Sequence, residues 1–327
     1  MGILYDRLLI LLNESSSDST FYHIALAMLQ NMELLHSLAI NEVADLCRVS
    51  KSTISKFIRA LGYEDYAEFR EAAKFQDNKY KNRFNYIEDV MGYLKNHTPE
   101  QYAVQMARDI RTTEEELDWT AIDRLVEDLI RYKKVFALGM MFSGTAAMDL
   151  QIKLGYCGKF IVATLDDIKQ TGNIARADAD TLLIVFSDSG QYLNRYDTID
   201  DFYHKDIFNT TKAKIVLITS DETMAHDPRV AYSILFRRGD EVHTHRTAYP
   251  FISDMIAWRY REATRKKREH WYNAQTKART FWQTAECTRF LFPNCEICHV
   301  SNTDKYNRSN EQQTGIWSTM TKKRRRI

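Results

Sequence analysis

The chain has 327 residues, of which 44% are hydrophobic and 27% charged, with a net charge of +1. This composition excludes a disordered or collagen-like chain and is typical of a globular protein with room for two domains. The small net charge also excludes bulk attraction to nucleic acid, so any preference for DNA has to come from local charge placement.

The cysteines and the apolar runs indicate the cellular compartment of the protein. The five cysteines have no disulfide framework pattern, which favours a reducing compartment. They are Cys47, Cys157, Cys287, Cys295 and Cys298. Asp6 and Arg7 interrupt the apolar N-terminal run, and no stretch approaches the roughly 20 apolar residues of a membrane helix. We therefore expect a cytoplasmic protein with no membrane partner.

Residues 1–76 are predicted to be an all-helical domain. Apolar residues recur at helical spacing in FYHIALAMLQNMELL, then around residues 40–47 and again around 51–62. Only a few residues separate the last two segments. Two short helices joined by a tight turn match the helix-turn-helix layout, whose second helix enters the major groove of DNA.

The second of these helices has two opposite faces. Ile54, Phe57, Ile58 and Leu61 form an apolar stripe, with Ser50 as the expected N-cap and Gly62 as the expected stop. The opposite face is polar and basic, without the acidic residues of an ordinary solvated helix. This favours DNA contact over solvent exposure alone. The predicted DNA-binding residues are Ser50, Lys51, Ser52, Thr53, Ser55, Lys56 and Arg59.

The rest of the chain divides into three predicted regions. Residues 77–133 are a helical connector with an apolar pattern at Ile122, Leu125, Val126, Leu129 and Ile130. Residues 134–267 alternate apolar strands with helical segments, which predicts a doubly wound α/β domain with a parallel sheet. The expected strands are KVFALG, FIVATL, TLLIVFS, KIVLITS and AYSILF, followed by a closing helix over residues 250–267.

Two of these strands run into loops rich in glycine and serine. Ser187, Ser189 and Gly190 follow one strand, and Gly139 and Ser143 follow another. Ligands of parallel sheets bind at the carboxyl ends of strands, where hydroxyls and free N–H groups suit a phosphate. The serines could instead only cap helices. A nucleophilic serine is disfavoured, because the first glycine of a G-x-S-x-G elbow is missing.

The stretch AINEVADLCRVSKSTISKFIRALGYEDYAEFREAAK resembles the N-terminal domain of RpiR-type bacterial transcription regulators. Residues 134–265 resemble the sugar isomerase (SIS) domain of the same proteins. The resemblance implies a homo-oligomer, a dimer or a tetramer, that binds double-stranded operator DNA and a phosphorylated sugar effector. It carries the effector site onto Gly139, Ser143 and the S-x-S-G of residues 187–190.

The chain departs from this family pattern at two positions. Met141 replaces the second glycine of the first loop, and Tyr192 replaces a hydroxyl residue after the second loop. We expect both to add bulk where a ligand approaches, so a regulator with a degenerate sensor is one alternative. A sugar-phosphate isomerase is another, but its positioned acid or base is missing from the sequence. We therefore predict a regulator without enzymatic activity.

Residues 268–327 form a polar tail that we expect to be poorly ordered. Its CEICH (295–299) matches a haem attachment pattern that requires export, and a second C-x-x-C for zinc is missing. His243 and His245 share a strand face, where surface exposure is the commoner outcome. The KKRRR run (322–326) is expected to be a solvated charge cluster. We assign no metal site and no cofactor.

Overall fold

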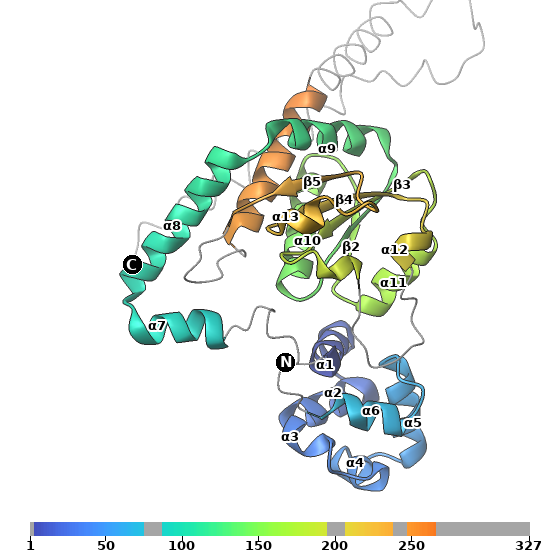
Figure 1. Ribbon diagram of the computed structural model, residues 1–327. Helices are drawn as coiled ribbons and strands as arrows, with labels where there is room; N and C mark the ends of the chain where they lie inside the picture. The colour runs from blue at the N-terminus through green and yellow to red at the C-terminus, as the bar shows by residue number, and fades with distance from the viewer. Residues whose placement is uncertain (1–2, 75–86, 195–206, 238–246, 266–327) are drawn as a thin grey trace, which may run out of the picture. The chain divides into compact units, whose positions relative to one another are not determined.

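The computed structural model describes residues 3–74, 87–194, 207–237 and 247–265 (Figure 1). It confirms the predicted fold class, an all-helical N-terminal part followed by an α/β part with a parallel sheet. No helix within these ranges is long and apolar enough to cross a membrane.

We call residues 3–74 the head. Its helices are α1 (Ile3–Glu14), α2 (Thr20–Gln30), α3 (Met32–Leu35), α4 (Ile40–Leu46), α5 (Lys51–Ala60) and α6 (Tyr66–Ala72). The stretch FYHIALAMLQNMELL is two helices rather than one, because Asn31 breaks it with φ −130° and donates its side-chain N–H to the Ala27 carbonyl at 2.8 Å. Asparagine competes in this way with the helical backbone. The helices share one apolar cluster that includes Leu8, Ile24 and Phe69.

The helices after the head lead into the sheet. They are η1 (Ile87–Met91), α7 (Gly92–Asn96), α8 (Pro99–Glu116) and α9 (Trp119–Arg131). The predicted apolar stripe of α9 is buried at Ile122, Leu125, Val126 and Leu129, whereas Ile130 is exposed. The buried residues belong to the same apolar cluster as one face of the sheet, so α9 is one of the helices that cover it.

The sheet has five parallel strands in the order β2-β1-β3-β4-β5. They are β1 (Lys134–Leu138), β2 (Val162–Ala163), β3 (Thr181–Phe186), β4 (Lys214–Thr219) and β5 (Tyr232–Leu235). All five predicted strands are present, although β2 has only two paired residues. Every residue of the central strand β3 is buried, as expected for a strand covered on both faces.

Helices cover both faces of the sheet (Figure 1). The connections are α10 (Phe142–Tyr156), α11 (Asp167–Ala175), the short η2 (Gln191–Leu193), α12 (Ile207–Thr210) and α13 (Glu222–Ala225). Helices α9, α10 and the closing helix, residues 247–265, pack on the face formed by alternate residues such as Ile184 and Val216. Helices α11 and α12 pack on the other face, around Leu183 and Leu217.

Residue 247, the first one described after the gap, is already helical, whereas the sequence predicts a closing helix from residue 250. Residues Tyr249, Ile252 and Ile256 of this helix are fully or almost fully buried in the sheet's apolar cluster. This packing brings Tyr249 close to the loop that follows β1.

Candidate functional sites

One apolar face anchors α5 to the rest of the head, as predicted. Ile54, Phe57, Ile58 and Leu61 are each at most 2% exposed. The Phe57 ring meets Phe21 edge-on, with 5.3 Å between the ring centroids, a geometry that adds ~0.5–1.5 kcal/mol beyond burial. The rotation of α5 about its own axis is therefore fixed, and its basic face is left exposed.

The two predicted end signals of α5 are confirmed. Ser50 is the N-cap, and its Oγ accepts the N–H of Thr53 at 3.2 Å. At the other end, Gly62 adopts φ +85°, and the Tyr63 N–H bonds back to the Ile58 carbonyl at 3.2 Å. A glycine in this left-handed conformation is a common helix stop. The first turn of α5 therefore begins at Lys51.

Most of the predicted DNA-binding residues are exposed, and only Thr53 and Ser55 are half-buried. None of the three cations Lys51, Lys56 and Arg59 is paired with a carboxylate among the residues that the structure describes. Free cations on one helix face are suited to neutralising phosphates. These residues are the part of the predicted set most available to DNA.

The remaining hydroxyls of the predicted set take part in the first turn of α5. The Ser50 Oγ lies 2.8 Å from the Thr53 Oγ1 and 2.9 Å from the Ser52 Oγ. The Ser55 Oγ donates to the Lys51 carbonyl at 3.1 Å. These bonds hold the start of the helix in place, so Ser50, Thr53 and Ser55 have a structural use that is independent of any DNA contact.

Arg48 is a candidate that the sequence analysis did not single out. It lies in the turn between α4 and α5, is exposed, and adopts φ +54°. The turn closes through the Val49 N–H, which donates to the Ala44 carbonyl at 2.9 Å. This places a further cation two residues before the N-cap of α5. The sequence could have indicated Arg48 as a DNA contact, because it lies inside the turn of the predicted helix-turn-helix.

Two glycines shape the loop after β1. A Cβ on Gly139 would lie 2.6 Å from the Ser143 carbonyl carbon, and a Cβ on Gly144 would lie 2.9 Å from the Gly139 carbonyl oxygen. No side chain other than hydrogen fits such a close approach of two backbone segments. The pair therefore brings the first turn of α10, including Ser143, against the end of β1.

Met141 occupies a strained backbone position in this loop. Its φ of 51° and ψ of −118° lie in a region that residues with a Cβ rarely adopt. The resemblance described in the sequence analysis implies glycine at this position, and glycine would adopt this backbone conformation without strain. The Met141 side chain itself is 38% exposed.

Ser143 is held by a buried tyrosine. Its Oγ lies 3.2 Å from the Tyr249 hydroxyl. Tyr249 is 1% exposed and packs edge-on against Phe186 and Phe236. Burial raises the pKa of Tyr249, so the phenol stays neutral and remains available as a hydrogen-bonding partner. The sequence analysis missed this partner, because it lies 106 residues away in the chain.

The loop after β3 is equally tight. The Ser187 N–H donates to the Ile218 carbonyl at 3.0 Å, and the Ser187 side chain is buried. Gly190 adopts φ +66°, and a Cβ there would lie 2.3 Å from the Cβ of Met224. Ser189, between them, is partly exposed. Ser189 is therefore the hydroxyl of this loop most open to a ligand.

The two loops lie at the same place in the sheet. Strands β1 and β3 are neighbours, with Leu138 paired to Val185. Strand β2, which follows β1 in the chain, lies on one side of β1, and β3 lies on its other side, so the strand order reverses at β1. Such a reversal of strand order leaves a crevice at the carboxyl ends of the two strands, where doubly wound proteins bind ligands. The predicted effector residues lie in these two loops, except for Ser143, which lies in the first turn of α10.

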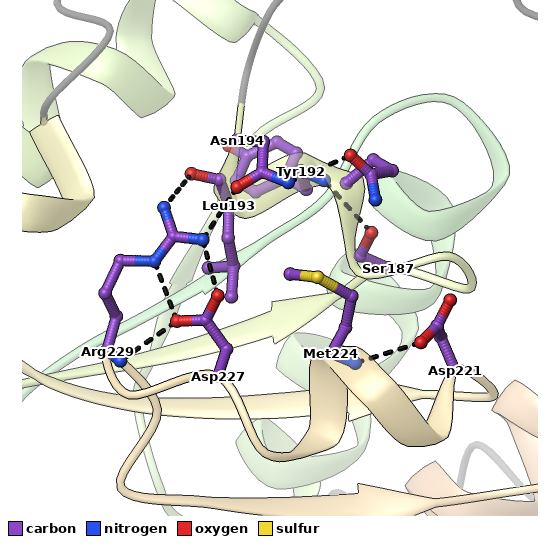
Figure 2. Close-up of polar contacts among 9 residues, drawn as sticks. Ser187, Tyr192, Leu193, Asn194, Asp221, Met224, Asp227 and Arg229 are labelled. Atoms are coloured by element: carbon purple, nitrogen blue, oxygen red, sulfur yellow. Dashed lines mark hydrogen bonds and ion pairs between the residues drawn. The ribbon is translucent and has the colours of Figure 1, made fainter.

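An arginine fastens the far end of the β3 loop (Figure 2). Arg229 binds Asp227 through two hydrogen bonds, of 2.8 Å from Nε and 2.6 Å from Nη2. Its remaining N–H groups reach the Leu193 carbonyl at 3.0 Å and the Asn194 side chain at 2.7 Å. The short segment after Gly190 is thereby tied to the segment between β4 and β5.

The expected effect of Tyr192 has to be corrected. Its ring is 7% exposed and lies in the apolar cluster on the α11 side of the sheet, with 5.7 Å between its centroid and that of Phe208. Apolar burial therefore draws the ring into the core, and it adds no exposed bulk to the loop. Its hydroxyl donates to the Oε1 of Gln170, a residue that the sequence analysis did not consider.

Several sequence-based candidates lie outside the described residues. They are His243, His245, the tail cysteines Cys287, Cys295 and Cys298, the CEICH stretch 295–299 and the basic run 322–326. The predicted boundaries of the connector and the tail remain predictions.

Comparison with known proteins identifies the head. Residues 13–78 match the family model described as "Helix-turn-helix domain, rpiR family". The head is therefore a helix-turn-helix domain of this family, as the resemblance predicted. A curated relative from Providencia stuartii, an "Uncharacterized HTH-type transcriptional regulator in aarA 3'region", is 23% identical over 195 residues, which are 58% of this chain and 67% of the relative.

Two solved structures are distantly similar to the chain. The NanR protein of Vibrio vulnificus, complexed with ManNAc-6P, is 16% identical with a TM-score of 0.43, covering 86% of this chain and 98% of that one. The sugar isomerase domain of an RpiR transcription factor from Sphaerobacter thermophilus is 15% identical with a TM-score of 0.42, covering 56% and 98%. The functional assignment of the two loops rests on their own geometry.

Proposed function

We propose that this chain is a transcription regulator whose head binds double-stranded operator DNA and whose α/β domain binds a phosphorylated sugar that changes the affinity for DNA. The observation that carries the first half is the exposed basic face of α5 in an rpiR-family helix-turn-helix domain. Lys51, Ser52, Lys56 and Arg59 are the proposed contacts, and we add Arg48 from the adjoining turn. The protein would bind as a dimer on a two-fold symmetric site, as such domains commonly do.

The second half is supported by the two loops at the reversal of strand order. A phosphate needs several donors that converge on one point, and hydroxyls with nearby backbone N–H groups supply them. Ser143 and Ser189 are the hydroxyls least enclosed by the fold, while Gly139 and Gly190 give the backbone its close turns. A sugar phosphate would bind with its phosphate between the loops.

The effector can act only by binding the DNA-competent and DNA-incompetent states of the protein unequally. Such coupling typically amounts to ~1–3 kcal/mol, or roughly 5- to 150-fold in affinity. An isomerase is the alternative function. It would require a general acid or base at the loops. Two titratable side chains lie there: Asp188, whose Oδ1 accepts the Ser220 hydroxyl at 2.6 Å, and Tyr249, whose hydroxyl lies 3.2 Å from the Ser143 Oγ. An assay for turnover decides whether either of them acts in catalysis.

Two measurements with the full-length protein test the proposal. In the first, fluorescence anisotropy follows binding to DNA fragments taken from upstream of the encoding gene, with and without a panel of aldose, ketose and hexosamine phosphates. In the second, the same sugar phosphates are incubated with the protein without DNA and assayed for conversion. We expect DNA binding that at least one sugar phosphate changes, and no conversion.

The other outcomes separate the alternatives. Conversion of a sugar phosphate without any DNA binding would identify an isomerase. DNA binding that no sugar phosphate changes would identify a regulator with a degenerate sensor. Absence of specific DNA binding across the fragments, with random-sequence DNA as the control, would overturn the assignment of α5.

A further inference from the structure

Gln170, on α11, is a fully buried amide with all its hydrogen-bonding positions filled. It is 0% exposed. Its Nε2 donates to the Gly139 carbonyl at 2.8 Å and to the Thr164 carbonyl at 2.7 Å. Its Oε1 accepts the Gly139 N–H at 3.1 Å and the Tyr192 hydroxyl. Two donors and two acceptor positions are the full capacity of a side-chain amide.

These four bonds connect the carboxyl ends of three adjacent strands. Thr164 follows β2, Gly139 follows β1, and Tyr192 lies in the loop after β3. The pairing of β1 with its neighbours ends at Leu138. Gln170 then takes the place of a neighbouring strand for Gly139, because it bonds both the N–H and the C=O of that residue.

Tyr192 extends this connection to the serine loop. Its backbone N–H donates to the Ser187 Oγ at 3.3 Å, and its ring is buried beside Leu193 and Phe208. The Tyr192 hydroxyl therefore bonds the β3 loop to Gln170. Through it, the position of Ser187 depends on the same amide that holds Gly139.

We propose that Gln170 is a positioning residue of the effector site, and that the Tyr192 hydroxyl keeps the two ligand loops in register with each other. The inference rests on the proposed function, because it concerns the phosphate site formed by those loops. A ligand held by two loops binds well only if their donors are already placed within about 0.5 Å. A link between the loops lowers the ordering cost of binding.

Tyr192→Phe tests the inference, since it removes the hydroxyl and keeps the buried ring. The matched control is Tyr232→Phe in the same domain. Tyr232 is the first residue of β5, so it lies at the end of the sheet opposite to the two loops, and its hydroxyl donates to Asp128 at 2.7 Å. Inorganic phosphate is the probe, titrated calorimetrically against the full-length protein. We expect Tyr192→Phe to weaken phosphate binding roughly 3- to 10-fold and Tyr232→Phe to leave it unchanged.

Hydrogen exchange supplies a readout that needs no ligand. Because the Gly139 N–H is bonded to Gln170, we expect Tyr192→Phe to speed the exchange of the Gly139 amide, and Tyr232→Phe to leave it as in the wild type. Wild-type phosphate affinity and wild-type Gly139 exchange in Tyr192→Phe would overturn the inference. Failure of the unmodified protein to bind phosphate would instead contradict the proposed effector site, while the exchange experiment would still decide whether the loops are linked.

Discussion

Arg229 and Asp227 form a two-pronged ion pair, with hydrogen bonds of 2.8 Å and 2.6 Å between guanidinium and carboxylate. Both side chains are largely enclosed, with exposures of 18% and 12%. The same guanidinium binds the Leu193 carbonyl and the Asn194 side chain. Arg229 therefore holds together two segments that are 35 to 36 residues apart in the chain, at the proposed effector site.

This ion pair predicts a specific dependence of stability on pH. The hydrogen bond from Arg229 lowers the pKa of Asp227. A carboxylate whose pKa is lower in the folded state adds stability above its unfolded pKa of about 4, and loses it as the pH falls further. We expect Asp227→Asn to cost about 1–2 kcal/mol near neutral pH, measured by urea unfolding, with a cost that shrinks toward about pH 3.

Asp180→Asn is the control for this experiment, because Asp180 is exposed and its substitution removes a charge without removing an ion pair. Its effect on unfolding should be small at every pH. A cost of Asp227→Asn that stays constant across the pH range would contradict the role of the charged pair.

The exposed cations of α5 predict a change in the salt dependence of DNA binding. Replacing Lys51, Lys56 and Arg59 together with Ala should weaken binding to every DNA sequence and lower the slope of log affinity against log salt by about 2–3. The fold of the head should be unchanged, because all three side chains are exposed. Anisotropy titrations at several salt concentrations measure both quantities.

A matched variant removes the same charge elsewhere. Lys95, Arg108 and Lys133 are also exposed cations, and they lie outside the head. Their combined replacement with Ala should leave the salt slope nearly unchanged. If the two triple variants lost DNA affinity and salt slope equally, net charge, and not the face of α5, would govern the affinity for DNA.

The strained backbone of Met141 predicts a stabilising substitution. Met141→Gly should raise the free energy of unfolding by about 1 kcal/mol, because glycine relieves the strain at φ 51° and ψ −118° by more than its extra freedom in the unfolded chain costs. Met141→Ala keeps the strain and removes only the side chain. Thermal unfolding of both variants separates the relief of backbone strain from the loss of the side chain. A destabilised Met141→Gly would refute the assignment of strain.

The exposed hydroxyl of the β3 loop predicts how the effector response can be removed. Ser189→Ala should abolish the effect of the sugar phosphate on DNA affinity and leave DNA binding without effector intact. Ser187→Ala is a less direct test, since the Ser187 Oγ also accepts the Tyr192 N–H and its loss would disturb the loop. Calorimetry on Ser189→Ala that gives wild-type effector affinity would place the phosphate elsewhere.

Much of the architecture was determined by the sequence alone, because it depends on local periodicity. The spacing of Ile54, Phe57, Ile58 and Leu61 decides which side of α5 is buried, and Ser50 and Gly62 decide where that helix begins and ends. The uninterrupted apolar run of β3 likewise identifies a strand covered on both faces. Glycine and serine after β1 and β3 mark the loops, since parallel strands leave their carboxyl ends at one edge.

Only the tertiary structure decided the partners of these loops. No local signal marks the long-range partners of Gln170, Tyr249 and Arg229, because Tyr192, Ser143 and Leu193 lie between 22 and 106 positions away from them. The direction of the Tyr192 ring could not be predicted from the sequence either, since a tyrosine that follows a strand can face solvent or the core. The space beside Phe208 and an acceptor on Gln170 draw it inward: burial of a large ring is favourable when its hydroxyl finds a partner.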